Sequence, residues 1–364
     1  MIQSFIYKSE NNNTYIYDDQ HRLSMLVHPE FEKAIEKNPD TDVFYLKKYA
    51  YLMNHGFFVN PKLPNFRALE EHTVRENIIN AKQVVFECTD SCNLSCTYCA
   101  YGKIYEGFDV RTGEKINTNN AIKLLKYIFD LQPKNKNKKL YISFYGGEPL
   151  LNMDFIKKIV EISNQFNEEK ELQLEFSMTT NATLIHKYID FLYAHKFHLL
   201  ISLDGDKKNN SYRVFSKNNK NSFWKVIENL DMIKRDYSEY FSSHVNLNAV
   251  LHNRNSVKEI YEFIYYRYNK IPRIGELNMR EINPDYKDTL KSMFQSKWKS
   301  EEEYLEKSSL YHITHSELSS YKELTDFLKY YSINYYISNI NALLHIVEKY
   351  LPTSTCTPFS KKIF

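Results

Sequence analysis

The chain has 364 residues, 43% of them hydrophobic and 26% charged, which is typical of a globular protein with two or three domains. Its net charge of +3 is too small to indicate nucleic acid or an anionic membrane as the main partner. No apolar run approaches the ~20 residues that span a bilayer, and the first residues contain no apolar signal-peptide core. We therefore predict a cytoplasmic protein that binds neither nucleic acid nor membrane.

The first 75 residues are predicted to form a small α+β domain. Three short segments alternate apolar and polar residues as strands do, at residues 4–10, 13–19 and 22–28. Residues 29–38 and 42–56 carry helical spacing, and the second helix is expected to end at Gly56. Residues 61–78 contain two prolines and mixed polarity, which predicts a linker.

From residue 82 onward, strand and helix patterns alternate. Six segments have strand character, at residues 82–88, 139–147, 172–181, 197–205, 245–252 and 274–282. Helical spacing fills the intervals, at residues 119–131, 153–166, 186–197, 222–237 and 256–269. This order predicts an α/β fold with a parallel sheet, either open or curled into a partial barrel, whose chemistry collects at the strand C-terminal ends.

After residue 285 the sequence becomes polar and helical, so residues 286–364 are predicted to form a mostly helical extension. A lone Cys356 follows, and the last residues, SKKIF, look like a strand that has been cut. We therefore expect this sequence to be a fragment of a longer chain.

Four of the five cysteines lie in the stretch ECTDSCNLSCTYCAYG, residues 87–102. A reducing cytoplasm disfavours disulfides, so this clustering indicates metal binding or catalysis. Cys92, Cys96 and Cys99 are spaced C-x3-C-x2-C, and such a loop can wrap three thiolates around an iron–sulfur cube and leave its fourth iron open. Cys88 ends a predicted strand and is a poor fourth ligand. Structural zinc is the alternative, although the sequence contains no second C-x2-C knuckle and no His pair at zinc-finger spacing.

Four motifs in chain order carry a resemblance to a known family. The cysteine motif with Tyr98 before its last cysteine is similar to that of the radical S-adenosylmethionine (radical SAM) superfamily. Three later segments agree with it: YGGEPL (145–150), TTNATLI (179–185), in which Ala182 stands where glycine is usual, and ISLDGDKKNNSYRVF (201–215). The last of these, with the following NSFWKVIENL (221–230), resembles the branch with SPASM-type C-terminal extensions, which includes peptide maturases and anaerobic sulfatase maturases.

The resemblance covers about residues 82–282 and implies that residues 76–285 form a partial (β/α)6 barrel of parallel strands. It further implies a [4Fe–4S] cluster on the three cysteines, with the methionine moiety of S-adenosylmethionine (SAM) chelating the open iron. The backbone of Gly146 and Gly147 would then approach the SAM ammonium, and Ser202 and Arg213 would hold its carboxylate.

Three further residues complete the predicted cofactor site. By the resemblance, Asn181 would reach the ribose hydroxyls and Tyr98 would pack beside the adenine. Glu148 is a carboxylate at a strand end, and we expect it to form structural hydrogen bonds near the cluster loop. The sequence identifies no catalytic acid or base.

The resemblance predicts an enzyme that cleaves SAM reductively to a 5′-deoxyadenosyl radical and modifies a ribosomally synthesised precursor peptide. A flavodoxin or ferredoxin would supply the electron. The N-terminal domain resembles in outline the winged-helix-like modules that capture leader peptides as an added strand, with a packing or dimerisation domain as the alternative. The segment TCTPFSKKIF resembles the start of a SPASM region, in which Cys356 would open an auxiliary iron–sulfur cluster site.

Two other functions stay open at this point. An anaerobic sulfatase-maturing enzyme, which forms formylglycine, has the same core, but its N-terminus typically lies close to the cluster strand. A non-catalytic zinc- or cluster-binding protein is the alternative from another class.

Overall fold

The computed structural model describes residues 4–8, 12–18, 21, 23–59, 70–106, 111–279 and 281–306. The chain divides into two compact units, one built mainly from Met1–Arg67 and the other mainly from Ala68–Glu301. The predictions for Cys356 and for the chain after residue 306 lie outside the described residues. The division at residues 75 and 285 stays a prediction.

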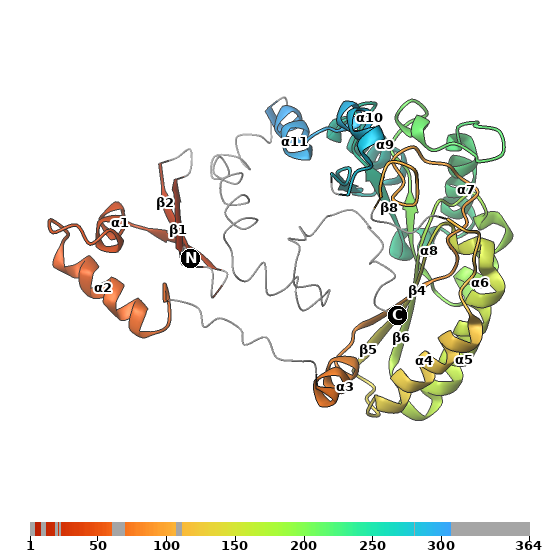
Figure 1. Cartoon of the computed structure of the whole chain (residues 1–364), viewed down its shortest axis with the longest axis horizontal. Coiled ribbons are helices and arrows are strands. Elements are labelled where there is room, and N and C mark those ends of the chain that lie inside the picture. The colour runs from red at the N-terminus through yellow and green to blue at the C-terminus, as the bar shows by residue number, and fades with distance from the viewer. Residues whose placement is uncertain are drawn as a thin grey trace. The chain divides into compact units, whose positions relative to one another are not determined.

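The N-terminal unit contains the three strands and two helices that the sequence predicts (Figure 1). Its antiparallel sheet has the order β1 (Ser4–Lys8), β2 (Thr14–Asp18) and β3 (Leu23–Val27). Helices α1 (Pro29–Ile35) and α2 (Val43–Asn54) follow. Gly56 comes just after α2 with φ +88°, the left-handed conformation that favours glycine behind a helix. The core of this unit is small and centres on the buried side chains of Ile16, Phe31 and Phe58.

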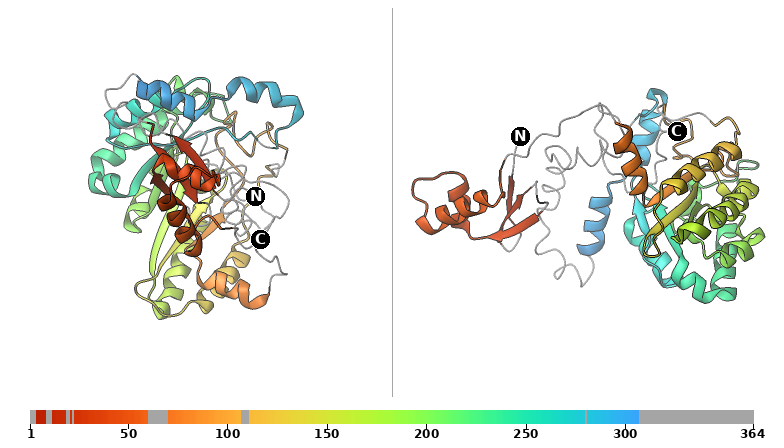
Figure 2. Two further views of the ribbon diagram at one scale, coloured as in Figure 1. Left: turned by 90° about the vertical axis from the view of Figure 1, so that its left-hand side faces the viewer. Right: turned by 90° about the horizontal axis from the view of Figure 1, so that it is seen from below.

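The larger unit is a six-stranded parallel sheet in which the strands stand in sequence order. They are β4 (Gln83–Glu87), β5 (Lys139–Tyr145), β6 (Gln173–Thr180), β7 (His198–Ser202), β8 (Val245–Val250) and β9 (Arg273–Gly275). The crossover helices cover the outer side of the sheet (Figures 1 and 2): α4 (Thr118–Leu131), α5 (Met153–Lys170), α6 (Ile189–Ala194), α7 (Phe223–Asp236), α8 (Ser238–His244) and α9 (Val257–Tyr268). This architecture confirms the predicted partial (β/α)6 barrel.

The strands of the barrel are apolar in sequence because their side chains are buried in its core. Leu140, Ile142 and Phe144 of β5 are almost completely buried. Phe144 stacks on Phe197 with ring centres 5.8 Å apart, and Phe155 of α5 packs edge-on against Phe86 at 5.7 Å. The first contact joins β5 to the start of β7, and the second joins the sheet to α5.

The predicted linker at residues 61–78 is partly a helix, which is a correction. Residues Glu71–Ile79 form α3, in which Arg75 pairs with Glu71 at 2.9 Å one turn away. Gln132 donates to the carbonyl of Ile78 at 3.1 Å, and the Lys138 ammonium donates to that of Ile79. These side chains come from distant parts of the sequence, so the local pattern does not reveal how the helix end is stabilised.

The sixth strand is much shorter than the predicted 274–282, because β9 ends at Gly275. The backbone of residues 281–283 pairs instead with residues 104–106, through Glu106 N to Glu281 O at 2.9 Å and Asn283 N to Ile104 O at 2.8 Å. The chain therefore leaves the sheet after Gly275 and crosses to the segment behind the cysteine motif.

Polar helices α10 (Lys287–Met293) and α11 (Lys297–Glu306) then follow, in agreement with the predicted helical character of this region. None of the helices in the described ranges has the length and apolarity required to cross a membrane.

Candidate functional site

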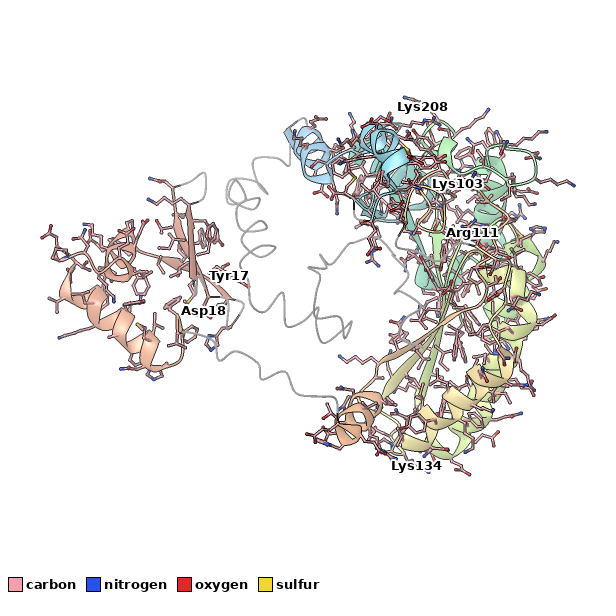
Figure 3. The ribbon with its side chains drawn as sticks, viewed as in Figure 1. Tyr17, Asp18, Lys103, Arg111, Lys134 and Lys208 are labelled. Atoms are coloured by element: carbon pink, nitrogen blue, oxygen red, sulfur yellow. The ribbon has the colours of Figure 1, made fainter. Side chains whose placement is uncertain are left out.

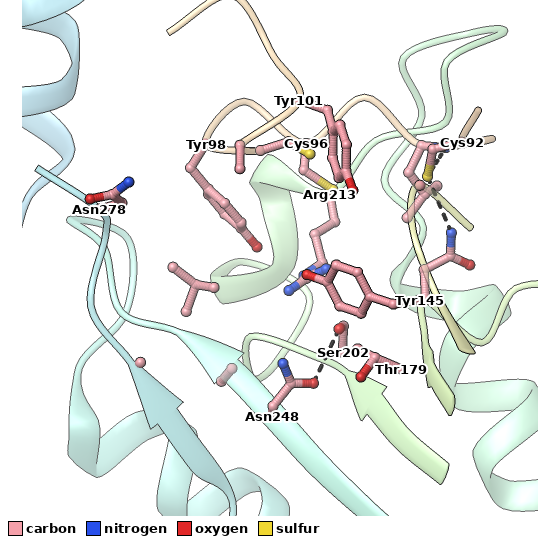
Figure 4. Close-up of a pocket in the computed structure, with 18 of the residues that line it drawn as sticks. Cys92, Cys96, Tyr98, Tyr101, Tyr145, Thr179, Ser202, Arg213, Asn248 and Asn278 are labelled. Atoms are coloured by element: carbon pink, nitrogen blue, oxygen red, sulfur yellow. Dashed lines mark hydrogen bonds between the residues drawn. The ribbon is translucent and has the colours of Figure 1, made fainter. Parts of the chain in front are cut away.

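A pocket opens at the C-terminal ends of the barrel strands, where the sequence predicts the chemistry (Figure 4). The thiols of Cys92, Cys96 and Cys99 all line it. Six of the seven residues predicted to bind the cofactor line it as well: Tyr98, Gly146, Gly147, Asn181, Ser202 and Arg213. The fold thus brings together residues that are separated by more than 100 positions in the sequence.

The cysteine loop is fixed to the segment that follows β7. Ser95 N donates to Val214 O at 2.8 Å, and Thr97 N donates to Tyr212 O at 3.3 Å. Within the loop, Cys99 N donates to Cys96 O at 3.0 Å and closes a turn. These backbone bonds direct the three thiols toward the pocket.

Each outer cysteine of the motif accepts hydrogen bonds at its sulfur. Leu94 N lies 3.4 Å from Cys92 Sγ, and Asn181 Nδ2 lies 3.7 Å from the same atom. Arg111 Nη2 lies 3.0 Å from Cys99 Sγ. Such donors stabilise negative charge on sulfur, which an iron–sulfur cluster requires of its ligands.

Within the described ranges, no three His, Cys, Asp or Glu side chains are grouped closely enough to bind one metal ion.

Burial raises the pKa of Cys92 to about 11 and that of Cys96 to about 12. Without a metal these thiols are therefore protonated at neutral pH, and metal binding must displace their protons.

Cys88 takes no part in the pocket. Its thiol is fully buried and donates to Phe86 O at 3.8 Å, and burial raises its pKa far above the usual value. Its carbonyl accepts hydrogen bonds from Ile116 N and Asn152 Nδ2. Cys88 is therefore a buried residue just after β4 and lies apart from the three thiols of the pocket.

The Gly-Gly pair is required by a close approach to the cysteine loop. A Cβ atom on Gly147 would stand 2.1 Å from Ser91 O, and one on Gly146 would stand 2.3 Å from Thr89 O. The peptide N–H of Gly147 donates to Thr89 O at 2.8 Å. The strand end and the start of the loop therefore pack backbone to backbone, which only glycine permits.

Glu148 lies behind the pocket wall and not in it. Its side chain is fully buried and accepts from Leu150 N at 3.2 Å, Thr180 Oγ1 at 2.7 Å and Asn181 N at 2.8 Å. Burial raises its pKa to about 7, against the effect of these three donors. Glu148 thus joins the ends of β5 and β6 through hydrogen bonds.

Arg213 faces the pocket but is already paired with a buried carboxylate. Its Nε and Nη2 donate to the two oxygens of Asp204 at 3.0 and 3.1 Å. The Tyr98 hydroxyl also donates to Asp204, and Val250 N does so at 3.0 Å. Burial alone would raise the pKa of Asp204, but the Arg213 charge and its hydrogen bonds hold it well below the usual range.

Ser202 and Asn181 face the pocket from neighbouring strand ends. Ser202 donates to Asn248 Oδ1 at 3.1 Å, and Asn181 donates to Asn93 Oδ1 at 2.9 Å. Ala182 has φ +62°, a left-handed conformation that explains why glycine is usual at this position of the motif.

Asn248 and Arg111 are among the polar pocket residues that the sequence analysis did not predict. Asn248 lies on the half-buried face of β8, between the buried Leu247 and Ala249, so it follows the ordinary strand alternation and that pattern does not single it out. Arg111 stands twelve positions after Cys99, outside any motif, and no sequence signal marks it.

A model of the radical SAM superfamily matches residues 86–264. A second model, described as DNA repair metallo-beta-lactamase, matches residues 278–343, most of which lie outside the described ranges.

Two curated proteins illustrate the similarity. The radical SAM cyclopropyl synthase TigE of Paramaledivibacter caminithermalis is 24% identical over 76% of this chain and 54% of its own length. A cysteine-type anaerobic sulfatase-maturating enzyme of Clostridium novyi is 29% identical over 57% of this chain and 56% of its own. The chain thus spans about half the length of these relatives.

Among solved structures, Streptococcus suis SuiB bound to the precursor peptide SuiA matches 91% of this chain and 78% of its own. That match has 13% identity and a TM-score of 0.44.

Proposed function

Because this chain belongs to the radical SAM superfamily, we propose that it is a maturase that modifies a ribosomally synthesised peptide by radical chemistry. Members of this superfamily use a [4Fe–4S] cluster and SAM. The observation that carries the proposal is that all three thiols of the C-x3-C-x2-C motif line one pocket at the barrel's C-terminal end.

The residues present fit both cofactors. In our proposal Cys92, Cys96 and Cys99 hold the cluster, and the buried Arg111 Nε, which has no hydrogen-bond partner among the described residues, suits an anionic neighbour. When bound, the cluster and SAM supply an electron and a carbon-centred radical that removes a hydrogen atom from the substrate.

The protein's own contribution is binding, orientation and exclusion of water. Asp204 engages only part of the five-donor Arg213 guanidinium, so N–H groups remain for the SAM carboxylate, with Ser202 beside them. Asn181 offers an amide for the ribose. The rings of Tyr98, Tyr101, Tyr105 and Tyr145 also line the pocket and would shield a radical from solvent.

A peptide substrate is supported by the relatives and by the N-terminal sheet. Strands β1 and β3 each pair only with β2 among the described strands, so both edges have backbone groups for an added strand. Leu26 of β3 is 63% exposed, which suits contact with an apolar peptide side chain. We propose that this sheet binds the precursor peptide, that a flavodoxin or ferredoxin is the reductant, and that any auxiliary clusters lie beyond residue 356.

A sulfatase-maturating activity is the second candidate, favoured by the 29% identity to the Clostridium novyi enzyme. The two candidates share the cofactor chemistry and differ in substrate. A sulfatase peptide would carry the cysteine or serine that becomes formylglycine, whereas a maturase acts on its own precursor peptide.

Anaerobic reconstitution tests the proposal. We expect a brown protein that forms 5′-deoxyadenosine from SAM and dithionite, and a variant with Cys92, Cys96 and Cys99 all changed to alanine that does neither. Cys88→Ala is the matched control and should retain both properties. A colourless wild-type protein that holds zinc would contradict the proposal. Mass spectrometry after incubation with the short peptide encoded beside the gene, or with a sulfatase peptide, separates the two substrates.

A further inference from the structure

Arg111 lies beside the cysteine loop and contacts it at two points. Its Nη2 donates to Cys99 Sγ at 3.0 Å, and its Nη1 donates to Leu94 O at 3.4 Å. The guanidinium carbon stands 5.4 Å from the ring centre of Tyr101, in a cation–π contact. Figure 3 marks its position in the larger unit. The side chain is therefore held at its tip by two hydrogen bonds and by the Tyr101 ring.

The segment that carries Arg111 is tied to the start of the same loop. The carboxylate of Asp90, only 3% exposed, accepts from Thr112 N at 2.7 Å, from Thr112 Oγ1 at 3.1 Å and from Gly113 N at 3.1 Å. Thr89 adds a bond to Glu114 O at 2.6 Å. These bonds hold Arg111 in a fixed position relative to the cysteine loop. Its contact with Cys99 is therefore supported by the surrounding fold.

The charge of Arg111 is not offset by a carboxylate. Arg213, the other arginine at the cysteine loop, forms a two-point ion pair with Asp204. Arg111 forms no ion pair with any residue in the described ranges, and its buried Nε has no hydrogen-bond partner there. Its positive charge therefore acts mainly on the sulfur that it touches.

We propose that Arg111 is a positioning residue that raises the reduction potential of the iron–sulfur cluster through its charged hydrogen bond to Cys99. This inference rests on the proposed cluster site. Reduction adds one electron from a low-potential donor such as dithionite or a ferredoxin, and no bond breaks and no proton moves. A fixed cation and an N–H donor at a ligand sulfur stabilise the added negative charge, so the reduced cluster forms more readily.

The test is a redox titration followed by electron paramagnetic resonance, on reconstituted protein without SAM or peptide. In Arg111→Gln we expect the reduction equilibrium to shift at least tenfold toward the oxidised cluster, a potential about 59 mV lower for one electron. Arg111→Lys keeps the charge and loses the planar guanidinium. Its reduction potential should therefore lie between those of the wild type and of Arg111→Gln. Arg254→Gln is the matched control, because Arg254 also stacks on a tyrosine, at 3.7 Å from the Tyr212 ring centre, but lies outside the pocket.

Iron and sulfide content accompany every titration. An Arg111→Gln protein with full iron content and an unchanged potential overturns the inference. So does an equal loss of iron in Arg111→Gln and Arg111→Lys, because Arg111 would then hold the loop and not tune the cluster. A wild-type protein that binds no cluster at all overturns the proposed function itself, and is recognised by its missing iron before any titration begins.

Discussion

Each side of the pocket carries an arginine and has a buried carboxylate behind it, but the two sides arrange these groups differently. On the ion-pair side, formed by the ends of β7 and β8, Asp204 and Arg213 bind each other. On the cysteine side, formed by the ends of β4, β5 and β6, Glu148 accepts only from neutral donors and Arg111 contacts a thiol. The charges of the ion-pair side therefore neutralise each other, whereas the charged groups of the cysteine side do not pair with each other.

This difference separates two tasks of the pocket. A buried, hydrogen-bonded ion pair holds its partners in fixed positions, so the ion-pair side provides a rigid surface for a ligand. An unpaired cation beside sulfur changes the energy of whatever the sulfur binds. Substitutions on each side should therefore have different consequences, and four of them test that expectation.

The largest effect is expected from Gly147→Ala, on the cysteine side. The new methyl group would stand 2.1 Å from Ser91 O, so the cysteine loop must move away from the strand end. We expect iron content after reconstitution to fall to background. Gly56→Ala is the control, because Gly56 has a positive φ but its nearest neighbour would be 3.9 Å from the new Cβ. That variant should lose some stability and keep its iron; a Gly147→Ala protein with full iron content would refute the close-approach argument.

Asp204→Asn tests the ion-pair side. The substitution leaves Arg213 buried without a counter-charge, which typically costs about 3–5 kcal/mol of unfolding free energy. Urea unfolding measures this loss. The exposed pair of Asp231 and Arg267, 2.6 Å apart, is the matched control, and Asp231→Asn should cost less than about 1 kcal/mol. Equal losses in the two variants would show that Asp204 contributes no more than a surface charge.

The sequence predicts much of this comparison and misses the rest for identifiable reasons. The strands of the barrel and the cysteine motif are local patterns, and they are found where the sequence indicates them. Residues 281–283, close to the predicted end of the sixth strand, pair with residues 104–106 instead, and the segment of Arg111 is held by Asp90, about twenty positions away. Contacts of this kind depend on the folded chain, and no single stretch of sequence encodes them.

Glu148→Gln tests the unpaired carboxylate of the cysteine side. Burial raises the pKa of Glu148 from 4.5 to about 7, so the folded protein binds this proton more tightly than the unfolded chain does. The contribution of Glu148 to stability is then full below about pH 4.5 and declines as the pH rises through about 7. We expect the stability of wild type relative to Glu148→Gln to fall by up to about 3 kcal/mol between pH 5 and pH 8. Urea unfolding at both pH values measures it, and a difference that grows with pH would contradict the assignment.

Ala182→Gly is expected to have the smallest effect, because two terms oppose each other. Glycine relieves the left-handed conformation of residue 182, φ +62°, which costs an alanine about 1 kcal/mol. It also removes a fully buried methyl group, worth about 0.8 kcal/mol, so the net change in unfolding free energy should be a few tenths. Lys196 is exposed and has φ +51°, so Lys196→Gly measures the relief of the left-handed conformation alone. This variant should stabilise the protein. If Ala182→Gly costs several kcal/mol while Lys196→Gly stabilises, the Ala182 methyl group supports the cysteine side far more than its burial alone explains.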